Sequence, residues 1–165
     1  MSHTIDRLSP QCDPIFINAN RHLADYRQLG FDVYPDVEGA DGGPLAGITA
    51  LLKQARGDAM LIVPVDTPLL PTDLGIRLLQ GLTPSADLAF ASTPAGPQRL
   101  HAVVRRRCLT SLAEAHAEGI KSVTDWQTAL HCRHVAFDDD ASFYNVNTPS
   151  DANAIAKRLG YTFAT

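Results

Sequence analysis

The chain has 165 residues, of which 45% are hydrophobic and 19% are charged, and its formal net charge is -4 at pH 7. These values exclude a disordered chain and predict a single domain spanning residues 1–165. The negative charge gives no positive field for a nucleic acid, and no apolar run approaches the roughly 20 residues that cross a bilayer. We therefore expect no nucleic-acid and no membrane partner, and a cytoplasmic location.

Strand-like and helix-like segments alternate through the first half of the chain. Apolar runs predict strands at residues 14–18, 31–36 and 59–65, and the last run suits a parallel strand that is covered on both sides. Helical spacing of apolar residues, with proline near the start or glycine at the end, predicts helices at 22–30, 44–57 and 71–81.

The second half is less regular. Two strand-like runs, 87–93 and 99–106, flank a turn that contains proline and glycine, which favours an antiparallel pair. Helices are predicted at 108–119 and 123–131, a strand at 133–138, and a last helix at 147–160 with Thr148 as its N-cap. Strands that alternate with helices predict an α/β fold with a mixed sheet and right-handed crossovers.

A carboxylate follows the apolar run "LIVPV" directly. Asp66 would lie at the carboxyl end of its strand, where ligands collect in open parallel sheets. A carboxylate in that place can hold Mg²⁺ beside phosphate oxygens. The alternative is that Asp66 caps the turn that begins at Thr67 and Pro68.

The segment "PDVEGADGGPLAGI" offers a second candidate site. Its glycines permit close backbone approach, and the predicted helix start near Pro44 offers free N–H groups to an anion or a polar base edge. Asp36, at the end of the preceding strand, could accept hydrogen bonds from a ribose or a base. The alternative is a flexible loop before an ordinary helix.

The segment "NVNTP" places two amides on one side of an extended stretch. Asn145 and Asn147 lie two residues apart, and each side chain offers two donors and an acceptor, which complement the edge of a pterin or a purine. Turn chemistry before a helix is the alternative. The stretch "NAN" repeats the pattern with Asn18 and Asn20.

Taken in order, "INANR", "PD", "GPLAGI", "VPVDTPLLP" and "NVNTP" resemble the molybdenum cofactor guanylyltransferase (MobA) family. The resemblance runs from about Pro14 to the final helix. It implies a Rossmann-like nucleotidyltransferase fold with a mostly parallel sheet, an antiparallel part and helices on both faces. It also implies an enzyme that uses Mg²⁺ and transfers GMP from GTP to molybdopterin.

The resemblance also implies roles for particular residues. It assigns Asp66 to catalysis and metal binding, and places Asn18, Asp36 and Asp66 at the nucleotide. It adds a stretch beside the nucleotide, formed by Gly43, Pro44, Leu45, Ala46 and Gly47. On the molybdopterin side it places His101, Asn145 and Asn147. Many members carry a His-Pro pair at His101, and Ala102 replaces that proline here.

One departure from the family is large. Members begin with a strand and a loop of the form L-A-G-G-x-x-x-R-M-G-G-x-D-K, whose N–H groups and lysine cradle the triphosphate, and this sequence has no such segment. The usual first strand is therefore missing as well. Three explanations stand: a truncated version or misplaced start, a degenerate paralogue, or a protein that gains the strand from a partner.

Two other functions stay open beside guanylyl transfer. One is a non-catalytic homologue that binds molybdopterin or a nucleotide, and the other is cytidylyl transfer to the same pterin. Apart from GTP and molybdopterin, the partners that the resemblance suggests are molybdenum cofactor biosynthesis proteins or molybdoenzyme chaperones.

Overall fold

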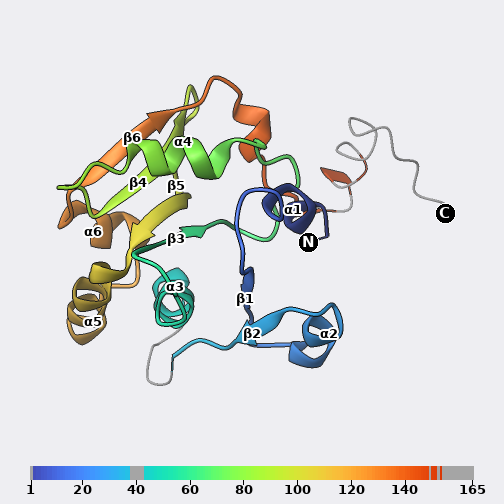
Figure 1. Ribbon diagram of the computed structural model, residues 1–165, viewed down its shortest axis with the longest axis horizontal. Helices are drawn as coiled ribbons and strands as arrows, with labels where there is room; N and C mark the ends of the chain where they lie inside the picture. Colours follow the sequence, from blue (N-terminus) through green and yellow to red (C-terminus); the bar gives the residue numbers. More distant parts are fainter. Residues whose placement is uncertain (1, 38–42, 149, 152, 154–165) are drawn as a thin grey trace.

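The structure is a computed structural model that describes residues 2–37, 43–148, 150, 151 and 153 (Figure 1). Its helices are α1 (Ser2–Leu8), α2 (Leu23–Gln28), α3 (Pro44–Leu52), α4 (Leu74–Gly81), α5 (Leu109–Ala117) and α6 (Val123–Thr128). Its strands are β1 (Phe16–Asn18), β2 (Asp32–Tyr34), β3 (Ala59–Ile62), β4 (Leu88–Thr93), β5 (Gly96–Arg105) and β6 (Cys132–Ala136). Two short 3₁₀ helices are η1 (Arg106–Cys108) and η2 (Asp140–Phe143). The predicted alternation of strands and helices is confirmed.

The strands form two separate sheets. β1 and β2 pair in parallel, and the larger sheet has the order β3-β5-β4-β6. Within it, β5 is antiparallel to both β3 and β4, whereas β4 and β6 run parallel. The mixed sheet and the antiparallel β4–β5 hairpin are therefore as predicted. The split between β1 and β3 was not predicted from periodicity, and Figure 1 shows the small sheet lying apart from the larger one.

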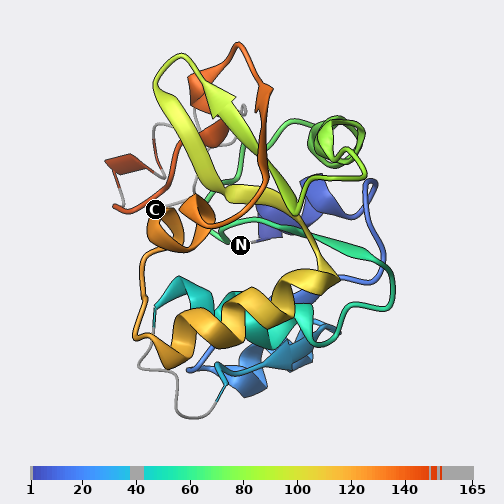
Figure 2. The same cartoon turned by 90° about the vertical axis from the view of Figure 1, so that its left-hand side faces the viewer.

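Helices cover both faces of the larger sheet. One apolar cluster lies between the sheet and α3, α5 and α6, and includes Leu45, Phe90, Leu112 and Trp126. The second lies on the other face, beneath α4 and α1. Figure 2 shows α3 and α5 side by side on one face and α4 on the other. Two clusters on opposite faces are what a sheet with apolar residues on both sides requires.

Two of the helix boundaries that differ from the sequence predictions are explained by local hydrogen bonds. The N–H of Leu74 donates to the carbonyl of Pro71 at 3.2 Å, so a turn precedes α4 and the helix begins three residues after the proline. The predicted helix 44–57 ends at Leu52, because the N–H of Ala55 bonds back three residues, to Leu52, at 3.2 Å. Such short-range bonds tighten the chain and stop the α-helical ladder.

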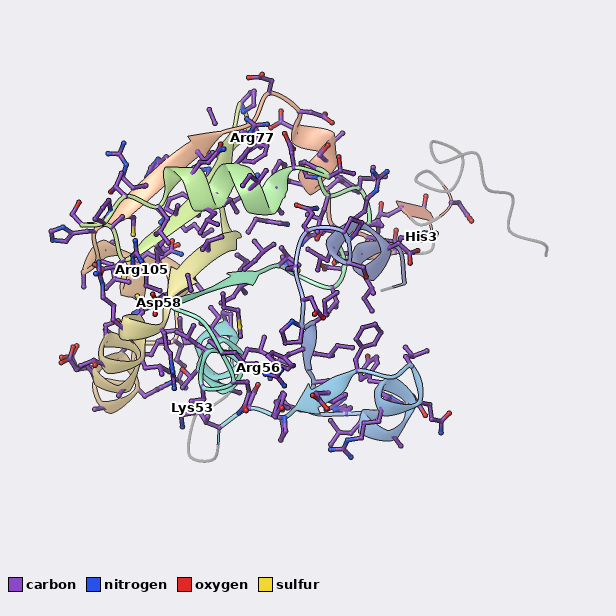
Figure 3. The ribbon with its side chains drawn as sticks, viewed as in Figure 1. His3, Lys53, Arg56, Asp58, Arg77 and Arg105 are labelled. Atoms are coloured by element: carbon purple, nitrogen blue, oxygen red, sulfur yellow. The ribbon has the colours of Figure 1, made fainter. Side chains whose placement is uncertain are left out.

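An arginine joins α4 to the end of β6. The guanidinium carbon of Arg77 lies 3.8 Å from the centre of the Phe137 ring, and the side chain donates to the carbonyl of Ala136 (Figure 3). A cation over an aromatic face is attractive, and the hydrogen bond fixes the direction of approach. In the described part of the chain, no helix combines the length and apolar character needed to span a membrane.

Neighbouring leucines on α4 give a test of this packing. Leu78 is fully buried in the second cluster, whereas Leu79 is 54% exposed. Leu78→Ala should lower the free energy of unfolding by about 2–5 kcal/mol, because it leaves a cavity in a close-packed core. Leu79→Ala should change it by less than about 0.5 kcal/mol. Urea unfolding of both variants measures the difference, and equal effects would contradict the packing.

Candidate functional site

Polar side chains at the carboxyl ends of β1 and β2 form a hydrogen-bonded group. The amide nitrogen of Asn18 donates to Asp36 Oδ1 at 2.9 Å and to the carbonyl of Tyr34 at 3.1 Å. Asn20 donates to Asp36 Oδ2 at 2.8 Å, and its amide oxygen accepts from the Asp36 N–H at 2.9 Å. The structure thus brings Asn18 and Asp36 together, as two neighbouring parallel strands require.

The start of α3 lies against this group. Gly43 precedes the helix with a φ of +102°, which only glycine adopts without strain, and Pro44 occupies the first turn. A Cβ added at Gly47 would lie 2.3 Å from Asn18 Oδ1, so the glycine leaves room for the Asn18 side chain in its observed position. Leu45 and Ala46 are buried, and their side chains serve packing.

Asp66 follows β3 and lies beside the "NVNTP" segment. Its carbonyl accepts a hydrogen bond from the N–H of Val146 at 2.8 Å. One carboxylate oxygen, Oδ1, is buried and has no hydrogen-bond partner in the described structure. The Thr4 hydroxyl of α1 donates to the carbonyl of Val65 at 2.9 Å, which fixes the chain just before Asp66. Asp66 is therefore close to the two candidate asparagines.

The segment around the asparagines is held by a capping box. The N–H of Asp151 donates to the Thr148 hydroxyl at 3.1 Å, and the Asp151 carboxylate accepts from the N–H groups of Thr148 and Asn147 at 2.9 and 3.2 Å. These bonds, with that from Thr148 first, lower the pKa of the Asp151 carboxyl. Asn145 and Asn147 are exposed and can meet a ligand. The predicted N-cap at Thr148 is confirmed, while residues 154–160 of that helix lie outside the described residues.

His101 lies deeper than the other candidates. Its side chain is 3% exposed, neither ring nitrogen has a hydrogen-bond partner in the described structure, and the ring packs edge-on against Phe143 at 5.0 Å between centroids. Burial lowers the pKa of His101 to about 4. The imidazole is therefore neutral at pH 7. Its contact with Phe143 supports the chain that leads into the "NVNTP" segment.

An apolar cavity of about 290 Å³ separates the two parts of the candidate site. Asn18, Pro44 and Gly47 line it on the side of β1 and α3, whereas Pro64 and Val65 line it on the side of β3, next to Asp66. The nucleotide-side and pterin-side residues predicted from the sequence are thus brought to the same region but belong to different sheets. Among the described residues, Asn18 bonds to Asp36 and lies against Gly47, and the carbonyl of Asp66 accepts from Val146, between the two asparagines.

The unpaired buried atoms mark this region. Among the described residues, the buried side-chain nitrogen and oxygen atoms without a partner are Asp66 Oδ1 and the two ring nitrogens of His101. Because buried polar atoms are almost always hydrogen-bonded, such exceptions indicate a ligand, a water or a functional role. Within the same described set, no group of three or more His, Cys, Asp or Glu side chains could hold a metal ion. A metal here would need ligands from a substrate as well as from Asp66.

Reasoning from the sequence missed the supporting residues. Asn20 was noted only as part of a repeated pattern, yet it fixes Asp36 through two hydrogen bonds. The contact of Val146 with Asp66 joins segments 80 residues apart, and no local signal could reveal it. Asp151, three residues after the predicted N-cap, accepts a bond from the N–H of Asn147 and so also orders the candidate site.

Comparisons with known proteins match most of the chain. A family model described as a MobA-like NTP transferase domain matches residues 1–132. The molybdenum cofactor guanylyltransferase of Shewanella frigidimarina is 38% identical over 159 residues, which cover 95% of this chain and 81% of that protein. The corresponding protein of Acidovorax ebreus is 37% identical over 168 residues, covering 93% of this chain and 80% of that one.

A solved structure agrees in fold. Molybdopterin-guanine dinucleotide biosynthesis protein A of Archaeoglobus fulgidus superposes with a TM-score of 0.76 at 19% identity, covering 96% of this chain and 84% of that chain. At this identity the likeness establishes a shared α/β nucleotidyltransferase fold.

Gly47 gives a test of the Asn18 position. Gly47→Ala should displace the Asn18 side chain from Asp36, because the new methyl group would overlap Asn18 Oδ1. The loss of that bond is offset by the greater helix propensity of alanine, so stability should change by less than about 1 kcal/mol. The side-chain amide resonances of Asn18 should move toward solvent-exposed positions in an NMR spectrum. Gly57→Ala, where no atom lies within 4 Å of the added carbon, should leave these resonances unchanged.

His101 predicts a specific pH dependence. Its pKa is about 4 in the folded protein and near 6.5 when unfolded, so between these values the unfolded chain binds the extra proton. The free energy of unfolding should therefore fall as the pH drops from 6.5 to 4, and His101 alone should contribute about 3 kcal/mol of this decrease. His101→Leu should remove this part of the pH dependence in urea unfolding, whereas the variant His131→Gln, at an exposed position, should keep it. Identical pH profiles for wild type and His101→Leu would contradict the burial.

Proposed function

This chain belongs to the MobA-like NTP transferase family, and we propose that it transfers GMP from GTP to molybdopterin, forming the guanine dinucleotide cofactor and releasing pyrophosphate. The name of the curated relatives supports this reaction, and their similarity extends over nearly the whole chain. We also propose that residues 1–165 act as one nucleotidyltransferase-like domain.

The guanine nucleotide is proposed to bind at the ends of β1 and β2 and at the start of α3. The hydrogen bond that Asn18 donates to Asp36 already orients both side chains, which reduces the entropy cost of positioning a ligand. The stretch from Gly43 to Gly47 brings backbone close to the Asn18 side chain, and the first turn of α3 presents the positive end of its dipole. Guanine, with both donors and acceptors on its edge, suits this mixed polar group.

Asp66 is proposed to hold Mg²⁺ with the phosphates of the nucleotide. The fit rests on one observation: Asp66 Oδ1 is a buried oxygen without a hydrogen-bond partner, and an ionised oxygen is the ligand type that Mg²⁺ prefers. When bound, the ion would offset the negative charge of the phosphates. Asp66 would then fix the nucleotide on the β3 side, while Asn18 and Asp36 fix it on the β1 side.

The pterin is proposed to bind along the "NVNTP" segment. Asn145 and Asn147 are exposed there, and the bond between Val146 and the carbonyl of Asp66 keeps them beside the carboxylate proposed to hold Mg²⁺. His101 would act as a positioning residue beneath this surface, through Phe143. The phosphate of molybdopterin would then attack the α-phosphate of GTP, and the chain's contribution is mainly to hold the two substrates in line.

The observation that carries this proposal is that the unpaired buried atoms of the described structure belong to Asp66 and His101, two residues of the site that the family resemblance implies. A protein whose polar groups served only folding would satisfy them. The asparagine and aspartate groups on each side of the cavity support the same location.

Asp66→Asn tests the proposed metal role. It keeps the size of the side chain but removes its charge, so the Mg²⁺-dependent part of GTP affinity should fall at least about tenfold and guanylyl transfer at least about 100-fold. A fluorescent GTP analogue titrated with and without Mg²⁺ measures the first effect, and chromatography of the dinucleotide product measures the second.

Asp32→Asn is the matched control, because Asp32 is an exposed carboxylate at the opposite end of β2 and should have no effect. Unchanged GTP affinity in Asp66→Asn would contradict the role of Asp66. Replacing GTP with CTP separates guanylyl from cytidylyl transfer. Tight GTP binding without any product would favour the non-catalytic homologue.

A further inference from the structure

Asp36 is held between two asparagines at the end of the small sheet. Asn18, the last residue of β1, donates to Asp36 Oδ1 at 2.9 Å, and Asn20, two residues later, donates to Asp36 Oδ2 at 2.8 Å. The amide oxygen of Asn20 also accepts from the Asp36 N–H at 2.9 Å. Asn20 therefore binds both the backbone and the carboxylate of Asp36, and together with Asn18 it fixes the direction in which the carboxylate points.

These bonds use the donors of the group and leave acceptors for a ligand. The amide nitrogen of Asn18 donates to Asp36 and, at 3.1 Å, to the carbonyl of Tyr34, so the atom of that amide left to bind a ligand is its oxygen. Each Asp36 oxygen receives one side-chain donor and, in an ionised carboxylate, keeps a further lone pair. The group is therefore best suited to a ligand edge that carries N–H or O–H donors.

We propose that Asn20 is a positioning residue for selection of the nucleobase. By holding Asp36 in place, it lets the carboxylate accept the N1–H and the 2-amino N–H of guanine side by side. This inference rests on the proposed function, which places guanine at Asn18 and Asp36, and it adds which edge of the base is read. Guanine carries these two donors on adjacent atoms, whereas adenine and cytosine present a ring nitrogen that is an acceptor beside their amino group. A second acceptor opposite a carboxylate oxygen is repelled.

The alignment of Asp36 is what this selection depends on. A carboxylate that accepts two parallel hydrogen bonds must keep both oxygens toward the ligand, and a rotation of the side chain loses both bonds together. Without Asn20, Asp36 would keep the side-chain bond from Asn18 and lose the two bonds made by Asn20. Asn20 is exposed, so its side chain contributes little to the apolar core, and its described hydrogen bonds are directed at Asp36.

The test compares the affinities of the intact chain for GTP and ITP in the presence of Mg²⁺ by titration calorimetry. Hypoxanthine, the base of ITP, keeps the N1–H of guanine and lacks the 2-amino group. The wild-type chain should bind GTP at least about tenfold more tightly than ITP, because ITP lacks a hydrogen bond to a charged group. In Asn20→Ala this ratio should fall below about threefold, and GTP itself should bind at least about tenfold more weakly.

Three further variants separate base selection from a general loss of affinity. Asn20→Asp keeps the size of the side chain, but its charge repels Asp36 Oδ2, so it should lose the GTP preference as well. Asp66→Asn should weaken GTP and ITP by the same factor and keep their ratio, because it acts at the phosphates. Gln28→Ala, which removes an exposed amide on α2, should leave both affinities within about twofold of wild type. Circular dichroism checks folding, and Asn20→Asp decides if Asn20→Ala does not fold.

The outcomes distinguish this inference from the proposed function. GTP binding with a GTP-to-ITP ratio near one in the wild type, or with a ratio that neither Asn20 variant changes, would overturn the inference alone. A third nucleotide, 2′-deoxy-GTP, should lose affinity in Asn20→Ala by the same factor as GTP. A loss confined to GTP would assign Asp36 to the ribose and also overturn the inference alone. Absence of GTP binding by the wild-type chain would overturn the proposed function and the inference together.

Discussion

The structure depends on α3, which packs against both sheets at once. Leu45, Ile48 and Leu52 enter the apolar cluster of the larger sheet, whereas Gly47 lies against Asn18 at the end of β1. With both sides occupied, nearly the whole helix is buried. Because no described strand pairs the small sheet with the large one, this helix, together with α1, carries the connection between them.

Much of the fold could be predicted from local signals. The antiparallel pair of β4 and β5 follows from two apolar runs around Gly96, and the N-cap at Thr148 follows from its spacing to Asp151. The start of α4 was placed too early, because Pro71 fits a helical first turn and a preceding turn equally well. The split sheet depends on pairing between distant segments, for which the sequence alone gives no periodic signal.

The candidate site also contains features that the sequence predicts and features that only the folded structure reveals. The family resemblance placed Asn18 and Asp36 at one nucleotide, and the structure brings them together because neighbouring parallel strands end at one edge. The depth of His101 could not be predicted, because alternation along β5 assigns it to a face but does not reveal that Phe143 will cover that face. The residues that hold the site in shape, such as Asn20, act through hydrogen bonds that only the folded chain reveals.

The separation of the sheets has a mechanical consequence. The residues proposed to contact the purine and the residue proposed to hold the phosphates through Mg²⁺ belong to different sheets. Among the described residues, helix packing joins these sheets, and no ladder of strand hydrogen bonds does. Under the proposed reaction, the width of the gap sets the span between a bound base and the attacking phosphate. Close-packed helices transmit small displacements. A change in how α3 and α1 pack would therefore change the spacing between the two sheets, and with it the fraction of time that the two substrates are aligned for in-line attack.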